Sequence, residues 1–343
     1  MVALPVLLIA GCGSPSQTST APTSSAVSPS EPGTSVSGSG TPNLAPTPNT
    51  SMSSASSLTT SSSNAVGNSP SPTLAATVPS AHPPAIPGVT WHATGAVAAG
   101  GTPTVEVAHV SHGSIGLMWM NAHALTFRYI PGYQYPEGSP QRSIDHEPST
   151  WVPTMVAAFN GGFHLSDDVG GYFYDGQLVK SLRPGLASLD ITTKGRISVG
   201  VWDHTITSTS GYEVIRQNLP PLVRHGRAQA YPGESNSAWG QSNGGISTAN
   251  RTALGELRDG TVVFAYGSEV QAYELADALV RVGARTAVML DMNKSWPTGF
   301  YYVPNGSGSP HGHRILPLVW REPSTYFHQF KKDFIVAEST PPR

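Results

Sequence analysis

The sequence predicts an α+β (mixed α/β) fold: a hairpin-rich mixed sheet with one clear β-α-β unit and few helices, preceded by a disordered tether. Three observations support this prediction. Short segments of alternating apolar residues are joined by Asp-Gly and His-Gly turns, as in β-hairpins. Only residues 272–279 show convincing helical spacing. Residues 13–88 contain one charged residue, Glu31, and no Phe, Tyr or Trp, so they cannot form an apolar core.

The N-terminus has the pattern of a bacterial lipoprotein. Residues 1–12 form an apolar run that is too short to span a membrane and ends in Leu-Ile-Ala-Gly-Cys, which resembles a lipobox. Cys12, the only cysteine, would then carry the lipid and begin the mature protein. The alternative is a chance apolar start with a buried cysteine, and no Lys or Arg precedes the run.

The remaining chain divides into a Ser/Thr/Pro-rich tether at 13–88 and one folded domain at 89–343. All but one of the 40 charged residues fall in the domain, with acidic and basic residues nearly balanced. No basic stripe is present, which argues against a nucleic-acid partner. No apolar run is long enough for a membrane span, so we expect attachment through Cys12 to the outer face of the bacterial cell membrane.

Paired alternating segments predict the hairpins. Asp175-Gly176 and Asp259-Gly260 are strong turn signals, because these residue types tolerate positive φ. His112-Gly113 and a turn ending in Gly195 join two further pairs, and residues 125–129 form another strand. The predicted hairpins comprise residues 105–119, 172–179, 187–201 and 252–266.

A β-α-β unit follows the last hairpin. Residues 261–266 form its first strand, 272–279 its helix, which Gly283 ends, and 286–290 its second strand. The two strands should be parallel, with a right-handed crossover. Asp291 would then lie just past the second strand, at the edge where open sheets bind ligands. Residues 155–159 form another strand that leads into Asn160-Gly161-Gly162.

Three motifs occur in a fixed order: Ala158-Phe159-Asn160-Gly161-Gly162-Phe163, then Arg251-Thr252-Ala253-Leu254-Gly255 with Asp259-Gly260, then Met289-Leu290-Asp291. Together they resemble the phosphodiester glycosidase family, whose vertebrate member uncovers mannose 6-phosphate by removing N-acetylglucosamine. The similarity covers residues 157–336 and is weaker at 217–223 and 332–336. Many family members have two glycines after the aspartate, where this chain has Met292-Asn293.

The resemblance implies cleavage of a bond between an anomeric carbon and a phosphodiester oxygen, through an oxocarbenium-like transition state. Arg251 can bind phosphate bidentately, and Asp291 can act as nucleophile or as the base that activates water. His164 can donate to phosphate or to the leaving oxygen. The predicted substrate-binding residues are Asn160, Gly161, Gly162, Thr252 and Asn293, the two glycines allowing close backbone approach.

Ordinary structural explanations stand beside these roles. Asp291 could cap a turn with Arg251 as its ion-pair partner, and Asn160-Gly161 is a common turn. The Asp167-Asp168 loop lacks an EF-hand pattern, and His311 and His313 lack a third ligand, so we expect no metal and no cofactor. Among the aromatic residues in polar loops, Trp239 and Trp296 are the best candidates for sugar stacking.

The sequence therefore predicts an envelope-anchored hydrolase of sugar-1-phosphodiesters or a related glycan bond. The alternative is a non-catalytic glycan-binding lipoprotein that keeps the pocket for recognition. A solute-binding lipoprotein is disfavoured, because the chain lacks a two-lobed series of β-α units.

Overall fold

The computed structural model describes residues 80–98, 100–140, 147–233, 236–240, 248–305 and 308–339. The chain divides into two units, 1–70 and 71–343, and all described residues belong to the second. The predicted lipobox with Cys12, and residues 13–79 of the predicted tether, lie outside the described residues. Within the described part, no helix is long and apolar enough to cross a membrane.

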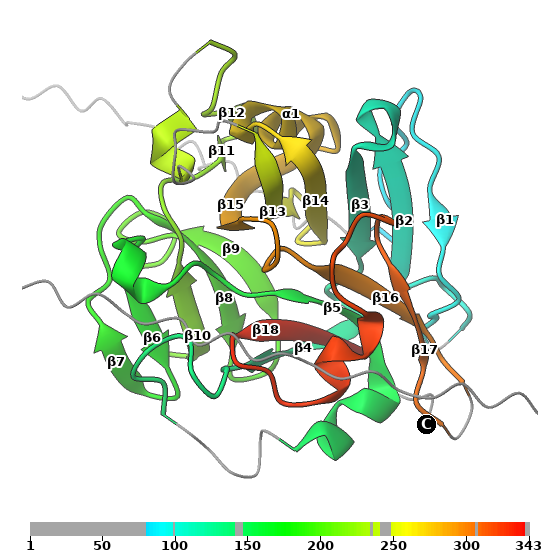
Figure 1. Ribbon diagram of the computed structural model, residues 1–343, viewed down its shortest axis with the longest axis horizontal. Coiled ribbons are helices and arrows are strands. Elements are labelled where there is room, and N and C mark those ends of the chain that lie inside the picture. The colour runs from blue at the N-terminus through cyan, green and yellow to red at the C-terminus, as the bar shows by residue number, and fades with distance from the viewer. Residues whose placement is uncertain are drawn as a thin grey trace, which may run out of the picture. The chain divides into compact units, whose positions relative to one another are not determined.

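The largest sheet has eight strands (Figure 1). The strands of the predicted 252–266 hairpin and of the β-α-β unit lie next to one another within it. Its order is β1 (His92–Ala93), β2 (Val105–Val110), β3 (Ile115–Met120), β14 (Val262–Val270), β13 (Ala249–Leu257), β15 (Ala284–Met292), β11 (Val223–Arg224) and β12 (Arg227–Ala228).

Two five-stranded sheets complete the domain. One has the order β7 (Gln177–Lys180), β6 (Tyr172–Tyr174), β10 (Tyr212–Gln217), β8 (Ala187–Thr192) and β9 (Ile197–Val201). The other has the order β17 (His311–Arg314), β16 (Gly299–Val303), β5 (Met155–Asn160), β18 (Phe334–Ser339) and β4 (Leu125–Ile130). Short 3-10 turns comprise Ser111–Gly113, Pro148–Thr150, Val152–Thr154, Leu165–Asp167, Asn236–Trp239 and Pro323–Phe327.

The one α-helix among the described residues is α1 (Ala272–Arg281), at the position that the helical spacing predicts. The backbone N–H of Gln271 donates to the Glu274 carboxylate at 2.8 Å, which satisfies one free donor at the helix start. Gly283 adopts a φ of 86° after the last turn, a conformation that favours glycine.

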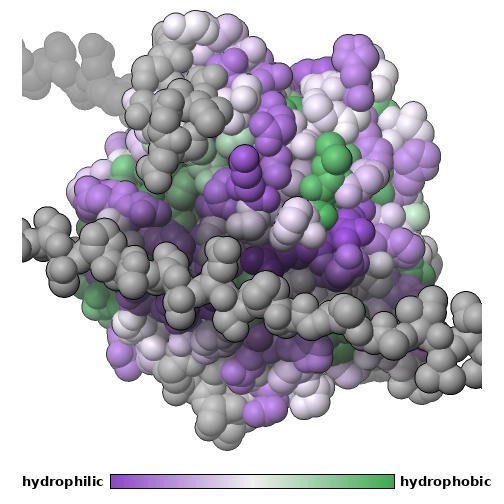
Figure 2. Space-filling model, viewed as in Figure 1, coloured by the Kyte–Doolittle hydropathy of each residue, from purple (hydrophilic) through white to green (hydrophobic). Residues whose placement is uncertain are grey.

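The eight-stranded sheet buries both of its faces. One face packs under α1, with Ala253, Val263 and Leu275 in a shared apolar cluster. The opposite face, with Leu254 and Val288, joins the main core that the two five-stranded sheets also line. The surface seen in Figure 2 is largely hydrophilic, and its apolar residues lie in small separate groups.

The predicted hairpins are confirmed, whereas the predicted mixed sheet is wrong. Every ladder between named strands in the described residues is antiparallel. The strands of the β-α-β unit, β14 and β15, do run in the same direction, but β13 lies between them and pairs with both. The hairpin partner therefore occupies the space that a direct parallel pairing would need.

The folded domain begins earlier than the predicted boundary at residue 89. The backbone N–H of Ser80 donates to Asp259 Oδ2 at 3.2 Å, and the Trp91 indole N–H donates to the Pro84 carbonyl at 3.1 Å. Ile86 is half-buried against the cluster under α1. Residues 80–88, assigned to the tether from composition, are therefore part of the domain surface.

Candidate active site

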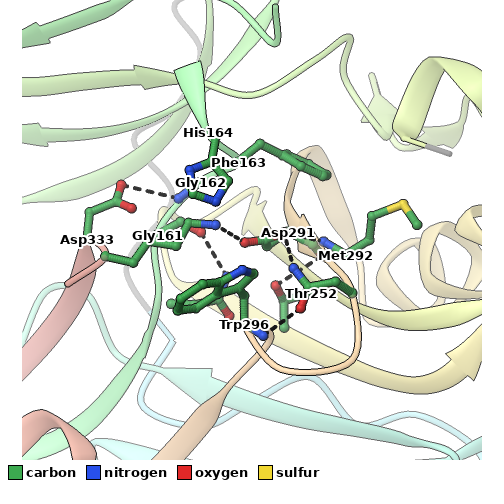
Figure 3. Close-up of polar contacts among 12 residues, drawn as sticks. Gly161, Gly162, Phe163, His164, Thr252, Asp291, Met292, Trp296 and Asp333 are labelled. Atoms are coloured by element: carbon green, nitrogen blue, oxygen red, sulfur yellow. Dashed lines mark hydrogen bonds and ion pairs between the residues drawn. The ribbon is translucent and has the colours of Figure 1, made fainter. Parts of the chain in front are cut away.

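A pocket of about 450 Å³ lies at the C-terminal end of β15. Its volume falls within the range of small-molecule binding sites in proteins. The loop that follows β5, the turn before β13 and the loop after β15 form its walls, and the central residues are drawn in Figure 3. The polar and aromatic lining residues are His164, Asp167, Ser237, Asp291, Asn293 and Trp296.

Asp291 presents a buried carboxylate to this pocket. Its side chain is 2% exposed, and Oδ1 accepts hydrogen bonds from the Met292 backbone N–H at 2.7 Å and Asn293 Nδ2 at 3.4 Å. Burial raises the pKa of Asp291, and Lys332 opposes that rise. The predicted position just past the strand needs correction, because β15 continues to Met292 and Asp291 pairs with Thr252 inside the ladder. The sheet therefore fixes the backbone of Asp291.

Thr252 lies opposite Asp291 on the neighbouring strand β13. Residues paired across an antiparallel ladder share a face, so both side chains lie on the same side of the sheet. Thr252 is fully buried, and its hydroxyl donates to the Asp291 carbonyl at 3.5 Å. It is absent from the described pocket lining, so the structure gives it a supporting position rather than the predicted contact with substrate.

Lys332 completes the site, and sequence reasoning did not select it. Its ammonium group donates to Asp291 Oδ2 and lies 5.4 Å from the centre of the Trp296 ring. The residue is 2% exposed, and a lysine is rarely buried without an acidic partner. The sequence signal was a Lys-Asp pair directly before the apolar strand β18, in a segment with only weak family similarity. Lys332 and Asp291 together form a buried ion pair at the pocket.

Asn160 uses its amide to connect two strands. Its Oδ1 accepts from the Thr298 backbone N–H at 3.0 Å, and its Nδ2 donates to the Gly161 carbonyl at 2.8 Å. The side chain is 2% exposed and is not among the pocket-lining residues that the structure describes. Asn160 therefore fixes the loop that leads into the pocket, and the expected contact with a sugar hydroxyl gains no geometric support.

Gly161 and Gly162 are required by packing against protein side chains. A Cβ atom at Gly161 would overlap the Asp333 carboxylate, and one at Gly162 would overlap the Asn218 amide. Their N–H groups already donate to Asp333, from Gly161 to the carbonyl at 2.8 Å and from Gly162 to Oδ2 at 3.3 Å. The expected close approach of a ligand to these backbone groups is therefore corrected: Asp333 occupies that position (Figure 3).

A buried charged network lies beneath the glycine loop. Arg216 Nε is 3.4 Å from Asp333 Oδ2, and another guanidinium nitrogen donates to the Phe163 carbonyl. The Tyr129 hydroxyl donates to the same Asp333 oxygen at 2.9 Å. Arg216 and Asp333 are both almost fully buried, so an isolated charge at either position would be costly. The network holds Phe163 in place and so positions the next residue, His164, at the pocket.

Arg251 lies on the other face of the sheet from Asp291. It pairs with Met292, while its neighbour Thr252 pairs with Asp291. The guanidinium group is fully buried, and it donates to the Val270 carbonyl at 3.1 Å and the Trp239 carbonyl at 2.8 Å. Burial lowers its pKa to about 10. The expectation that it reaches the pocket as a phosphate fork is therefore corrected to a position behind the pocket wall.

His164 and Trp296 are neighbours in the pocket lining. Their ring centres are 6.2 Å apart, and the His164 ring meets the Tyr135 ring edge-on at 4.0 Å. Nδ1 of His164 lies 4.0 Å from the Glu137 carboxylate, which also accepts from the Leu165 N–H at 3.2 Å. This arrangement fixes the imidazole orientation while leaving the ring in the lining.

The other sequence candidates lie apart from this chemistry. Trp239 is buried and donates its indole N–H to the Pro220 carbonyl at 3.1 Å, so it forms part of the wall rather than a sugar platform. Asp168 pairs with Arg183 at 3.2 Å, and His313 stacks on Tyr301. Within the described residues, no group of three or more His, Cys, Asp or Glu side chains is placed to hold a metal ion.

Comparison with known proteins places this geometry in context. Residues 153–302 match the family model described as phosphodiester glycosidase. No curated protein matches the chain significantly. Among solved structures, the catalytic domain of zebrafish N-acetylglucosamine-1-phosphodiester alpha-N-acetylglucosaminidase, auto-inhibited by its pro-peptide, aligns at 16% identity over 74% of this chain and 82% of that chain, with a TM-score of 0.41.

Two bacterial structures align less well. A hypothetical protein from Synechocystis shares 11% identity over 74% of this chain and 62% of that chain, with a TM-score of 0.35. A putative exported protein from Burkholderia pseudomallei K96243 shares 13% identity over 70% of this chain and 75% of that chain, also with a TM-score of 0.35.

The matched segment contains the glycine loop, His164 and Asp291, so the pocket lies in the part of the chain that is similar to a phosphodiester glycosidase domain. Lys332 and Asp333 lie outside the matched residues, although both contact residues within them.

Proposed function

We propose that the protein hydrolyses the bond between an anomeric carbon and a phosphodiester oxygen in a glycan. The observation that carries this proposal is the buried carboxylate of Asp291, held by Lys332 at a polar pocket within the family-matched segment. Such a reaction builds positive charge at the anomeric carbon and releases a phosphate monoester. A fixed carboxylate stabilises that charge most strongly in the transition state.

Lys332 gives Asp291 two properties that suit this chemistry. Its positive charge favours the ionised form of the carboxylate and opposes the rise in the pKa of Asp291 that burial causes. Because Lys332 is buried and is not among the described lining residues of the pocket, it holds the Asp291 carboxylate in place from behind rather than contacting the substrate.

The surroundings of Trp296 add positive charge near the pocket. Besides Lys332, Lys331 Nζ lies 5.0 Å and the Arg321 guanidinium 5.2 Å from the centre of its ring. Arg321 also donates from Nε to the Ser295 carbonyl at 3.0 Å, which fixes its position. Three cations around one pocket-lining ring create a potential that favours a phosphodiester over a neutral glycoside.

His164 is the group best placed to donate a hydrogen bond to the leaving phosphate. It lines the pocket, and its Nδ1 lies 4.0 Å from the Glu137 carboxylate. Phosphate leaves readily, so this contact stabilises negative charge rather than supplying an essential proton. Arg251 acts at a distance, since its bonds to Val270 and Trp239 fix the wall of the pocket.

Hydrolysis of defined substrates tests this proposal. The full-length protein should release free sugar and a phosphate monoester from sugar-1-phosphodiesters, and the preferred sugar should emerge from a panel of hexoses and N-acetylhexosamines. Asp167→Asn is the matched control for Asp291→Asn, because Asp167 is an exposed carboxylate in the lining of the same pocket. Tight glycan binding without turnover would contradict the proposal and support the non-catalytic glycan-binding alternative.

We also propose that the protein is anchored at the outer face of the bacterial cell membrane through lipidated Cys12. The apolar run and lipobox-like residues 8–12 support this location. Mass spectrometry of the membrane fraction should find a diacylated N-terminal cysteine, since stable anchoring needs more than one acyl chain. An unmodified Cys12 in a host that processes lipoproteins would contradict it.

A further inference from the structure

A second pocket, of about 510 Å³, lies at the opposite end of β13 and β15 from Asp291. Three arginines from separate segments meet there: Arg224 at the end of β11, Arg258 just after β13 and Arg285 near the start of β15. His225 also lines it, and Arg227 lines an adjoining hollow with Arg224.

The charge of this pocket is unbalanced. None of its three arginines forms a salt bridge or a side-chain hydrogen bond with any residue that the structure describes. Glu256 is the only carboxylate among the lining residues that the structure describes; its Oε2 accepts from the Val199 backbone N–H at 2.9 Å, and the charge of Arg285 partly offsets the rise in its pKa that burial causes, so one carboxylate faces three arginines. Assembling several guanidinium groups around a concavity is unfavourable unless an anion binds there.

The residue type indicates the chemistry of the ligand. Guanidinium groups bind phosphate and sulfate bidentately. Several arginines around a concave site therefore favour the binding of oxyanions over neutral sugars. A row of solvated arginines on a flat surface would be the ordinary alternative. Here the side chains come from three separate segments of the chain and line a pocket whose volume is comparable to that of the pocket at Asp291.

The two pockets lie on one face of the sheet. Thr286, which lines the arginine pocket, pairs with Glu256, and Asp291 pairs with Thr252, both on the face that joins the main core. Thr286 and Asp291 are five residues apart along β15, which corresponds to about 17 Å in a strand. This separation exceeds the Debye length of about 8 Å at physiological ionic strength, so charge removal at one pocket hardly changes the potential at the other.

We propose that the pocket of Arg224, Arg258 and Arg285 is a second oxyanion-binding site, which holds a phosphate group of an anionic glycan whose scissile bond lies at Asp291. The proposal rests on the proposed function for its choice of polymer. It predicts that the protein prefers polymeric sugar phosphates over a single sugar-1-phosphodiester, because only a polymer can occupy both sites.

Binding and kinetics together test this site. In an Asp291→Asn background, Arg258→Gln/Arg285→Gln should raise the Kd for a sugar-phosphate polymer by about tenfold for each arginine removed, since each loses a charged hydrogen bond. Chemical-shift changes on titration with inorganic phosphate should include residues around the arginine pocket and disappear in the double variant. With Asp291 intact, the double variant should raise KM for the polymer and leave kcat/KM for a short diester unchanged.

Arg281→Gln/Lys194→Gln is the charge-matched control, because both residues are exposed and lie outside this pocket. An equal loss of affinity in the control would overturn the site in favour of a general effect of net charge. Unchanged polymer affinity in the arginine variant would also overturn it. Because binding is measured without turnover, this result stays distinct from a failure of the proposed hydrolysis.

Discussion

The Lys332 ammonium group donates to the Asp291 carboxylate and joins the segment before β18 to the end of β15. Forty-one positions separate the two residues in the chain, and both are almost fully buried. The pair places the carboxylate of Asp291 in the pocket lining and the ammonium group of Lys332 behind it, next to Trp296. In the proposed reaction, the carboxylate stabilises the positive charge that builds at the anomeric carbon.

Removal of the lysine should move the pH dependence of catalysis. Lys332 lowers the pKa of Asp291 against the larger effect of burial, so Lys332→Met should raise that pKa further. Activity that needs the ionised carboxylate is then lost at higher pH, and the acidic limb of the kcat/KM profile shifts upward. Lys332→Arg keeps the charge and should shift the limb less. If the acidic limb of the kcat/KM profile does not shift in Lys332→Met, the Lys332–Asp291 pair does not set the pKa of the group that reacts.

Gly162→Ala should destabilise the protein by about 1–3 kcal/mol, the usual cost of overpacking a filled interior. The new methyl group would overlap the Asn218 amide, which accepts from the Phe163 N–H at 3.1 Å. Denaturant unfolding measures the loss. Gly308→Ala is the control, because the nearest atom to its Cβ lies 3.5 Å away.

A second substitution shows whether the overlap is the cause. Asn218→Ala in the Gly162→Ala background removes the atoms that overlap, so the two changes should be less than additive. Strict additivity would mean that Gly162 serves another purpose, such as the direct approach of a ligand.

The hairpins were predictable because their turns are local. Asp175-Gly176 and Asp259-Gly260 determine their own backbone conformations, and the flanking residues alternate regularly. Helix α1 was predictable from its spacing and from Gly283. The insertion of β13 between β14 and β15 was not predictable, since strand order depends on tertiary packing rather than on periodicity.

The site was only partly predictable for the same reason. Asp291 and His164 were found through motifs, and both line the pocket. Lys332 and Arg216 lie far along the chain from the residues that they contact, and no local pattern reveals such partners. Arg251 lies on the face opposite Asp291 because a one-residue step in a strand reverses the face, which a motif alone does not show.

Arg251→Lys should mainly lower stability. Lysine cannot reproduce the two hydrogen bonds from one guanidinium to Val270 and Trp239, so at least one buried carbonyl loses its partner, at about 1–3 kcal/mol. Thermal and denaturant unfolding measure this cost. A large fall in kcat/KM for phosphodiesters with unchanged stability would instead support direct contact between Arg251 and phosphate.

Asp190 should make stability depend on pH. It is fully buried in β8, and burial raises its pKa to about 8 against the smaller lowering effects of Ser188 and the Gly200 backbone. Between its unfolded pKa of about 4 and its folded pKa, the folded state holds more protons than the unfolded state. Its contribution to stability is therefore complete below about pH 4 and is lost as pH rises to about 8.

Comparison with Asp190→Asn isolates this effect. The free energy of unfolding of the wild type minus that of the variant should fall with rising pH, with a slope that approaches about 1.4 kcal/mol per unit. Asp203→Asn removes an exposed carboxylate and should show no such slope. A difference that stays constant from pH 4 to 8 would mean that Asp190 does not hold its proton in the folded state.

The position of bond cleavage tests the central claim most directly. Hydrolysis of a sugar-1-phosphodiester in ¹⁸O-labelled water should place the label on the anomeric hydroxyl of the released sugar, because Asp291 faces the anomeric carbon in the proposed reaction. Asp291→Asn should lower kcat by about 10²–10⁴ and change KM little, while Asp167→Asn should change neither strongly. Label in the released phosphate would show attack at phosphorus, and would contradict a glycosidase mechanism at this pocket.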